Sequence, residues 1–188
     1  MTGWLGISLG DITGVGPEVA LKAVAAESKN DDTKYLFIGD EQILARLNEK
    51  FSLNLPLKRN SGDSGRFFTT NPFLEKFSEN LPAGSPGAAN AAMAYLRDGA
   101  NRCLRGELDG IVTAPVNKEA IVRAGHKNFV GQTEFLSDLA KAKRTAMMLL
   151  GHDAQNRWLR VALTTIHISI KSVPEKLTAD KISLAVEL

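Results

Sequence analysis

The stretch WLGISLGDITGVGPEVALKAV (residues 4–24) decides the fold class. It begins with a short apolar run at residues 4–9, which is typical of a buried strand. A glycine-rich turn follows, and Pro17 stands where a helix would begin, because the first helical turn does not need the N–H that proline lacks. The apolar residues after Pro17 recur at helical spacing. This strand–turn–helix unit predicts an α/β chain with a mostly parallel sheet.

The same alternation of short apolar runs and helical patterns continues along the chain. Further strands are expected at residues 35–38, 109–113, 145–150 and 159–170, and helices around residues 43–47 and over 88–104, 117–123, 133–142 and 176–188. Residues 51–86 hold four of the seven prolines and are expected to form short strands and loops. The order predicts three layers, with helices on both faces of the sheet.

The composition excludes several classes of protein. Hydrophobic residues make up 44% and charged residues 23%, which is ordinary for a globular chain and argues against disorder. The net charge is +2 without runs of like charge, so we expect no nucleic-acid partner. The single cysteine, Cys103, cannot form a thiolate zinc cluster. No segment resembles a secretory signal or approaches the roughly 20 apolar residues of a membrane span, so we expect a cytoplasmic protein without a membrane partner.

Polar or glycine-rich clusters follow several predicted strands, at the edge where open α/β sheets bind ligands. The turn at residues 10–18 could offer helix N–H groups to an anion, although it matches neither the dinucleotide fingerprint nor the P-loop. The alternative is a tight turn capped by Asp11. At residues 112–119, Lys118 could hold a phosphate or carboxylate or stabilise a developing alkoxide. The alternative there is Asn117 as a helix cap, with Lys118 in solvent.

Two further clusters contain candidate ligand-binding residues. Gln132 and Thr133 begin a predicted helix and offer neutral hydrogen-bond donors to a phosphate or carboxylate, unless Thr133 is only a cap. Thr165 and His167 would share one face of the predicted strand at residues 159–170. His167 could bind a divalent metal through its neutral imidazole, whereas the alternative is a hydrogen-bonded core histidine.

Taken in this order, the stretches at residues 10–18, 106–119, 131–136 and 161–168 resemble the 4-hydroxythreonine-4-phosphate dehydrogenase family of vitamin B6 biosynthesis. The resemblance implies NAD- or NADP-dependent oxidation of 4-phosphohydroxy-L-threonine, a small phosphorylated amino acid. The 2-amino-3-oxo-4-phosphobutanoate product would lose carbon dioxide to give an aminoacetone phosphate on the way to pyridoxal phosphate. The resemblance also implies two α/β lobes like those of isocitrate and isopropylmalate dehydrogenases, a homodimer, and a divalent metal, commonly zinc.

The same resemblance assigns roles to four residues. His167 falls on the first of three metal-binding histidines, Gln132 and Thr133 fall on a His–Thr pair that contacts the substrate, and Lys118 falls on a catalytic lysine of the cleft. Gln132 departs from the family histidine and cannot carry a proton at neutral pH, and Ile166 replaces a family threonine.

No histidine follows His167, so this chain cannot complete the three-histidine centre. We therefore expect the N-terminal portion of a two-lobed dehydrogenase, with the second lobe incomplete and a lobe boundary near residues 125–131. Such a chain should be inactive alone.

Three other functions stay open. Because Gln132 replaces a substrate-contacting histidine, the substrate could be a related four-carbon phosphorylated hydroxy acid, such as a phosphoerythronate. A phosphate acyltransferase of similar fold would use the glycine-rich turns for coenzyme A and an acyl phosphate, and would need neither His167 nor a metal. A degenerate domain that only dimerises or binds a ligand is the non-enzymatic alternative.

Overall fold

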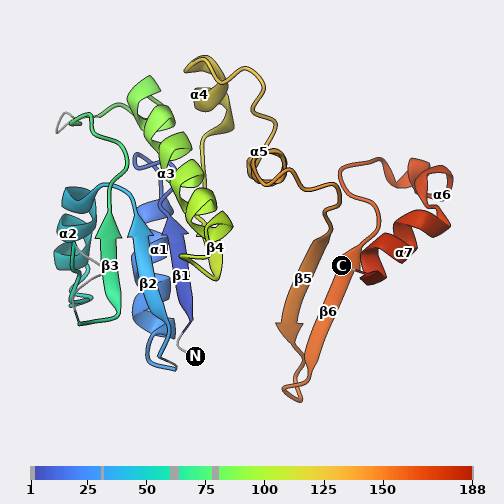
Figure 1. Cartoon of the computed structure of the whole chain (residues 1–188), viewed down its shortest axis with the longest axis horizontal. Coiled ribbons are helices and arrows are strands. Elements are labelled where there is room, and N and C mark those ends of the chain that lie inside the picture. Colours follow the sequence, from blue (N-terminus) through green and yellow to red (C-terminus); the bar gives the residue numbers. More distant parts are fainter. Residues whose placement is uncertain (1–2, 31, 60–63, 78–80, 188) are drawn as a thin grey trace. The chain divides into compact units, whose positions relative to one another are not determined.

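The computed structural model describes residues 3–30, 32–59, 64–77 and 81–187. The chain divides into two compact units, Met1–Ala140 and Lys141–Leu188 (Figure 1). This division lies C-terminal to the expected lobe boundary near residues 125–131. Among the described residues, no helix combines the length and the apolar character that crossing a membrane requires.

The first unit is built on a parallel sheet. In the described residues its strands are β1 (Trp4–Ser8), β2 (Lys34–Ile38), β3 (Phe67–Thr70) and β4 (Gly110–Thr113), in the order β3-β2-β1-β4. Each neighbouring pair is parallel. The helices are α1 (Gly16–Glu27), α2 (Glu41–Lys50), α3 (Pro86–Leu104), α4 (Lys118–Arg123) and α5 (Gln132–Leu139). The predicted α/β class and parallel sheet are confirmed for this unit.

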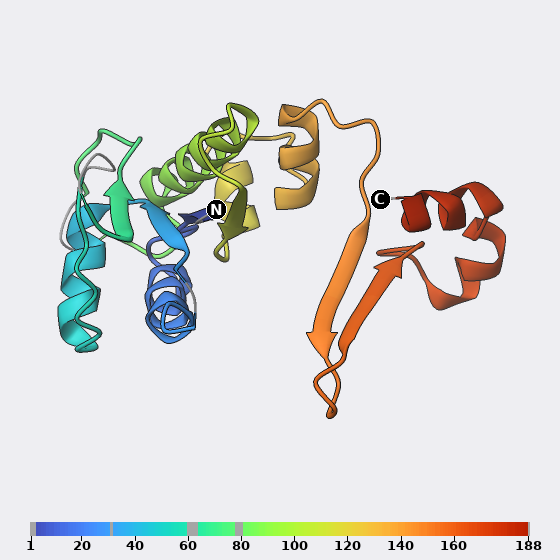
Figure 2. The same ribbon diagram turned by 60° about the horizontal axis from the view of Figure 1, so that its bottom comes forward.

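Helices cover both faces of the sheet. Figure 2 shows α3 on one side and α1 and α2 on the other. Strand β2 is therefore buried from Tyr35 to Ile38, as expected for a parallel strand covered on both faces. Helix α3 comes close to the sheet at Gly99, where an added Cβ would stand only 2.4 Å from Cδ1 of Ile111. The core thus lies between the sheet and its two helical layers.

The turn after β1 joins β1 directly to the end of β4. The backbone N–H of Asp11 donates to the carbonyl of Pro115 at 2.9 Å. Gly10 has a φ of +64°, and an added Cβ would stand 2.2 Å from the Pro115 carbonyl oxygen and 2.7 Å from that of Ala114. Glycine adopts this left-handed conformation without strain, and it alone leaves room for these carbonyls because it has no Cβ.

The second unit corrects the expectation that the last two strands join the parallel sheet. Strands β5 (Met147–His152) and β6 (Trp158–Leu163) form a separate antiparallel hairpin. The carboxylate of Asp153 closes the turn by accepting from the backbone N–H groups of Gln155 at 2.9 Å and Arg157 at 2.8 Å. So short a connection cannot join parallel strands, which need a crossover. After β6 come η1 (Ile170–Ser172), α6 (Val173–Lys176) and α7 (Ala179–Glu187).

The strand predicted at residues 159–170 is too long. Strand β6 ends at Leu163, whose partner Met147 is the first residue of β5, so the residues after Leu163 pair with no strand in the described part of the chain. His167 lies in the irregular segment that follows, with a φ of 55°. The expected placement of Thr165 and His167 on one face of a strand is therefore wrong.

Replacing Gly10 with alanine should lower the free energy of unfolding by about 3 kcal/mol, because the left-handed backbone and the two carbonyls both oppose a methyl group. Gly106→Ala is the matched control: its φ is +73° and nothing lies within 4 Å of its Cβ position, so a loss of only about 1 kcal/mol is expected. Urea unfolding followed by circular dichroism measures both values. If both variants lost the same free energy of unfolding, the close approach of β1 and β4 would not exclude a side chain at residue 10.

Candidate functional site

The candidate site of the first unit lies where β1 and β4 end. In the strand order β3-β2-β1-β4, the chain moves outward from β1 through β2 and β3, and then returns to the other side of β1 as β4. Open α/β sheets bind ligands beyond the carboxyl ends of the strands at such a reversal. Residues 10–15, 114–118 and the start of α5 meet there.

The turn at residues 10–18 is closed by its own side chains. Oδ1 of Asp11 accepts from the backbone N–H of Thr13 at 2.9 Å and from its hydroxyl at 2.6 Å. The Thr13 Oγ1 in turn accepts from the backbone N–H of Gly84 at 3.2 Å. The Asp11 carboxylate therefore stabilises the turn at Thr13. It does not cap α1, because the N-cap residue of that helix is Val15, without a side-chain hydrogen bond, so Asp11 leaves the first N–H groups of the helix unoccupied.

Lys118 is the first residue of α4. Oδ1 of Asn117 accepts from the backbone N–H of Ala120 at 3.0 Å, so Asn117 is the predicted helix cap. The Lys118 side chain is exposed and forms no hydrogen bond or ion pair with the residues that the structure describes. Its charge is therefore available to a ligand at the end of β4.

Gln132 links α5 to the end of β4. Its Nε2 donates to the carbonyl of Ala114 at 3.4 Å, whereas its Oε1 is buried and has no hydrogen-bond partner among the described residues. The adjacent Thr133 is exposed and does not cap α5, because the cap position is Gly131, without a side-chain bond. The alternative that Thr133 only caps the helix is therefore wrong. A buried acceptor without a donor is costly and therefore marks a place where a ligand can donate.

The three histidines have different surroundings. His126 places Nε2 3.0 Å from Oδ1 of Asn90, and the ring of His152 lies 4.1 Å from that of Trp158. His167 is exposed, so it is not a core histidine. Within the described residues, no three His, Cys, Asp or Glu side chains are grouped so that they could hold a metal ion.

Cys103 is not an activated nucleophile. Burial, and secondarily the negative charge of Asp109, raise the pKa of its thiol above the ordinary value. At neutral pH the reactive thiolate is therefore scarce. Covalent catalysis by this residue is not supported.

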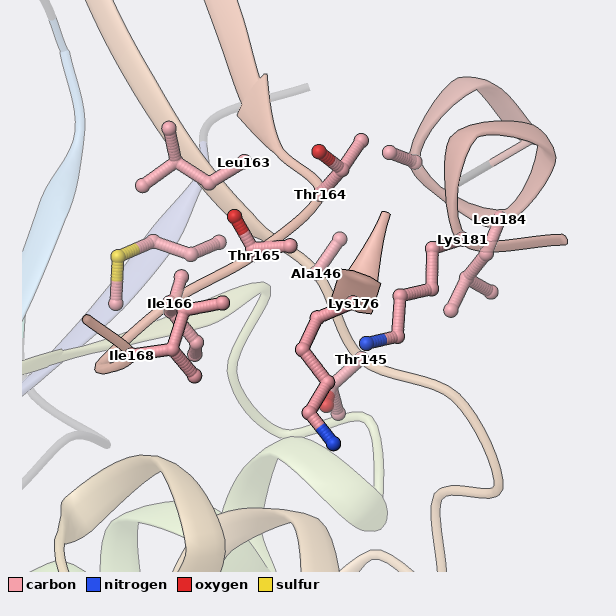
Figure 3. Close-up of a pocket in the computed structure, with 12 residues that line it drawn as sticks. Thr145, Ala146, Leu163, Thr164, Thr165, Ile166, Ile168, Lys176, Lys181 and Leu184 are labelled. Carbon is pink, nitrogen blue, oxygen red and sulfur yellow. The ribbon is translucent and has the colours of Figure 1, made fainter. Parts of the chain in front are cut away.

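A pocket of about 300 Å³ in the second unit was missed by the sequence reasoning (Figure 3). Its polar lining comes from three separate segments: Thr145 before β5, Thr164 and Thr165 after β6, and Lys176 and Lys181 of the C-terminal helices. No spacing in the sequence links these segments, because only the hairpin brings residues 145 and 164 together.

Gln132→Leu should leave the free energy of unfolding within about 0.5 kcal/mol of the parent value or raise it, because the lost hydrogen bond is offset by removal of an unpaired buried oxygen. Asn117→Ala should cost about 1 kcal/mol through loss of the α4 cap. Urea unfolding tests both variants. A loss above about 2 kcal/mol for Gln132→Leu would make Gln132 a structural residue.

Comparison with known proteins gives consistent matches. Residues 31–188 match the family model described as pyridoxal phosphate biosynthetic protein PdxA. A 4-hydroxythreonine-4-phosphate dehydrogenase from Synechococcus sp. is 36% identical over 98% of this chain and 54% of its own length. A protein from Oceanobacillus iheyensis named "Putative D-threonate 4-phosphate dehydrogenase" is 28% identical over 98% of this chain and 56% of its own length.

The fold also matches a solved structure. The crystal structure of a 4-hydroxythreonine-4-phosphate dehydrogenase from Burkholderia phymatum aligns with a TM-score of 0.83 and 31% identity, over 100% of this chain and 57% of that one. The chain spans about half the length of the curated relatives that it matches. Since the family model covers most of the sequence, the chain belongs to the PdxA family of pyridoxal phosphate biosynthetic proteins.

Proposed function

We propose that this chain forms the N-terminal portion of an NAD- or NADP-dependent dehydrogenase that acts on 4-phosphohydroxy-L-threonine. Oxidation of the secondary hydroxyl would release its proton, and the nicotinamide cofactor, when bound, would supply the hydride acceptor. The resulting 2-amino-3-oxo-4-phosphobutanoate loses carbon dioxide to give an aminoacetone phosphate. The observation that carries the proposal is the family match over residues 31–188, whose curated members include dehydrogenases of this name.

The polar groups at the end of β4 would bind the substrate. Lys118 would stabilise negative charge on the substrate, because its ammonium group is exposed and unpaired among the described residues. The buried Oε1 of Gln132 would accept a hydrogen bond from a substrate hydroxyl or ammonium group. Thr133 would donate its exposed hydroxyl to a phosphate or carboxylate. Since Gln132 cannot carry a proton, it would orient the substrate and not act as a general base.

The metal proposal is limited to His167. This histidine would be one of three metal ligands, commonly for zinc, in the complete enzyme. The described residues do not form a three-ligand group, so they do not fit a complete centre and we derive no catalytic step through the metal. No residue is assigned to the nicotinamide cofactor, because the glycine-rich turn at residues 10–18 matches neither the dinucleotide fingerprint nor the P-loop.

The proposal extends to the complete protein. We propose two lobes of the isocitrate dehydrogenase type with a boundary near residues 125–131, a homodimer, and a cytoplasmic location. The helix-covered parallel sheet and the likeness to the Burkholderia phymatum structure support the fold.

A second substrate is favoured by one specific observation. The Oceanobacillus iheyensis relative is named for D-threonate 4-phosphate, a four-carbon phosphorylated hydroxy acid without an amino group. Replacement of the family histidine by Gln132 fits a substrate of this class, because a neutral amide pairs with a hydroxyl as well as with an ammonium group.

The chain alone should show little or no NADH formation with either substrate. Fusing the C-terminal half of the Synechococcus sp. relative after Leu188 should create activity, since that half would supply the missing ligands. NADH absorbance with each substrate in the presence of zinc measures the rate. A folded fusion that is inactive on both substrates would refute the proposed function, and robust activity of the chain alone would refute the need for a second half.

In an active fusion, His167→Ala should abolish zinc-dependent turnover, whereas His152→Ala should retain it, because His152 stacks on Trp158 in the hairpin. Steady-state rates over a zinc titration test both variants. Full activity of His167→Ala would remove His167 from the metal site.

A further inference from the structure

The pocket in the second unit contains none of the residues assigned above to the substrate or the metal, yet it concentrates positive charge. Lys176 and Lys181 both line it, and no aspartate or glutamate does. Figure 3 shows both side chains directed to the side of the pocket where Thr145 lies. Among the residues that the structure describes, neither ammonium group forms an ion pair. An anion in the pocket would therefore be attracted to both ammonium groups.

Neutral donors surround the two ammonium groups. The hydroxyls of Thr145, Thr164 and Thr165 line the same pocket and form no hydrogen bond within the described chain. A hydroxyl can donate to a phosphate oxygen, and an ammonium group offers three donors without an acceptor. The polar part of the pocket therefore offers the hydrogen-bond donors that a phosphate group needs. No carboxylate of the described residues lines the pocket to repel a phosphate.

The remaining wall is apolar. Ile166, Ile168 and Leu184 face the pocket, which has a volume of about 300 Å³. This volume is at the lower end of the range for small-molecule sites, so it suits a small metabolite with a few carbon atoms beside its anionic group. Ile166 and Ile168 flank His167 in the sequence, so the pocket belongs to the segment that carries the proposed metal ligand.

We propose that this pocket binds the phosphate group of a small phosphorylated metabolite through Lys176, Lys181 and the three threonine hydroxyls. Identifying that metabolite with the enzyme's substrate rests on the proposed function, whereas phosphate binding itself does not. The side chains of both lysines are exposed, so the site is open to solvent and its affinity falls as salt rises.

Titration of the 188-residue chain with inorganic phosphate at constant ionic strength, followed by calorimetry, tests the site. Saturable binding is expected, and Lys176→Met and Lys181→Met should each weaken it about tenfold, since each removes one charge-assisted donor. Lys171→Met is the matched control, because Lys171 is an exposed lysine of the same unit that does not line the pocket. Acetate in place of phosphate distinguishes a phosphate site from a general anion site.

Three outcomes would overturn the proposal: no saturable binding, equal weakening in the Lys171→Met control, or acetate binding as tightly as phosphate. The active fusion separates this inference from the proposed function. There, Lys176→Met and Lys181→Met should raise KM for the phosphorylated substrate and leave kcat nearly unchanged. Phosphate binding by an inactive fusion would support the pocket and refute the function, whereas unchanged KM in an active fusion would refute the link to the substrate.

Discussion

The first unit depends on the close approach of two backbones where β1 and β4 end. The N–H of Asp11 reaches the carbonyl of Pro115 only because Gly10 has a left-handed backbone and no side chain. This contact fixes β4 beside β1 and allows α1 to begin directly after the turn. It also leaves the carbonyl of Ala114 where Gln132 can donate to it. One glycine thus positions both the sheet edge and the candidate site.

Polar groups at this end of the sheet fall into two kinds. Oδ1 of Asp11 accepts hydrogen bonds from Thr13 within the turn, and Oδ1 of Asn117 caps α4. Lys118 and the Oε1 of Gln132 have no partner among the described residues. A buried acceptor without a donor costs about 1–3 kcal/mol, so the fold bears at Gln132 a penalty that a ligand would remove. The groups with hydrogen-bond partners stabilise the local backbone, and the groups without partners are available to bind a ligand.

The second unit is held together differently. Its hairpin is stabilised by the hydrogen bonds between β5 and β6 and by the turn at Asp153. Among the described residues of this unit, Ala185 is the single buried hydrophobic residue. Two-stranded hairpins are marginally stable without further packing. Leu149 and Val161 face each other across the strands and are each more than half exposed, at 58% and 51%. Within the described residues of this unit, no layer of side chains buries this pair, unlike the strands of the first unit.

The sequence by itself determined the alternation of strands and helices, the parallel sheet and the cap at Asn117, because these depend on local periodicity and on a few neighbouring residues. It also carried the family resemblance, through four clusters in a fixed order. Only the tertiary structure decided that His167 lies outside a strand, that Gln132 has an unpaired buried oxygen, and that Lys176 and Lys181 share a pocket with Thr145. Strand ends depend on the partner strand, and burial and charge pairing depend on residues far apart in the chain, which periodicity does not record.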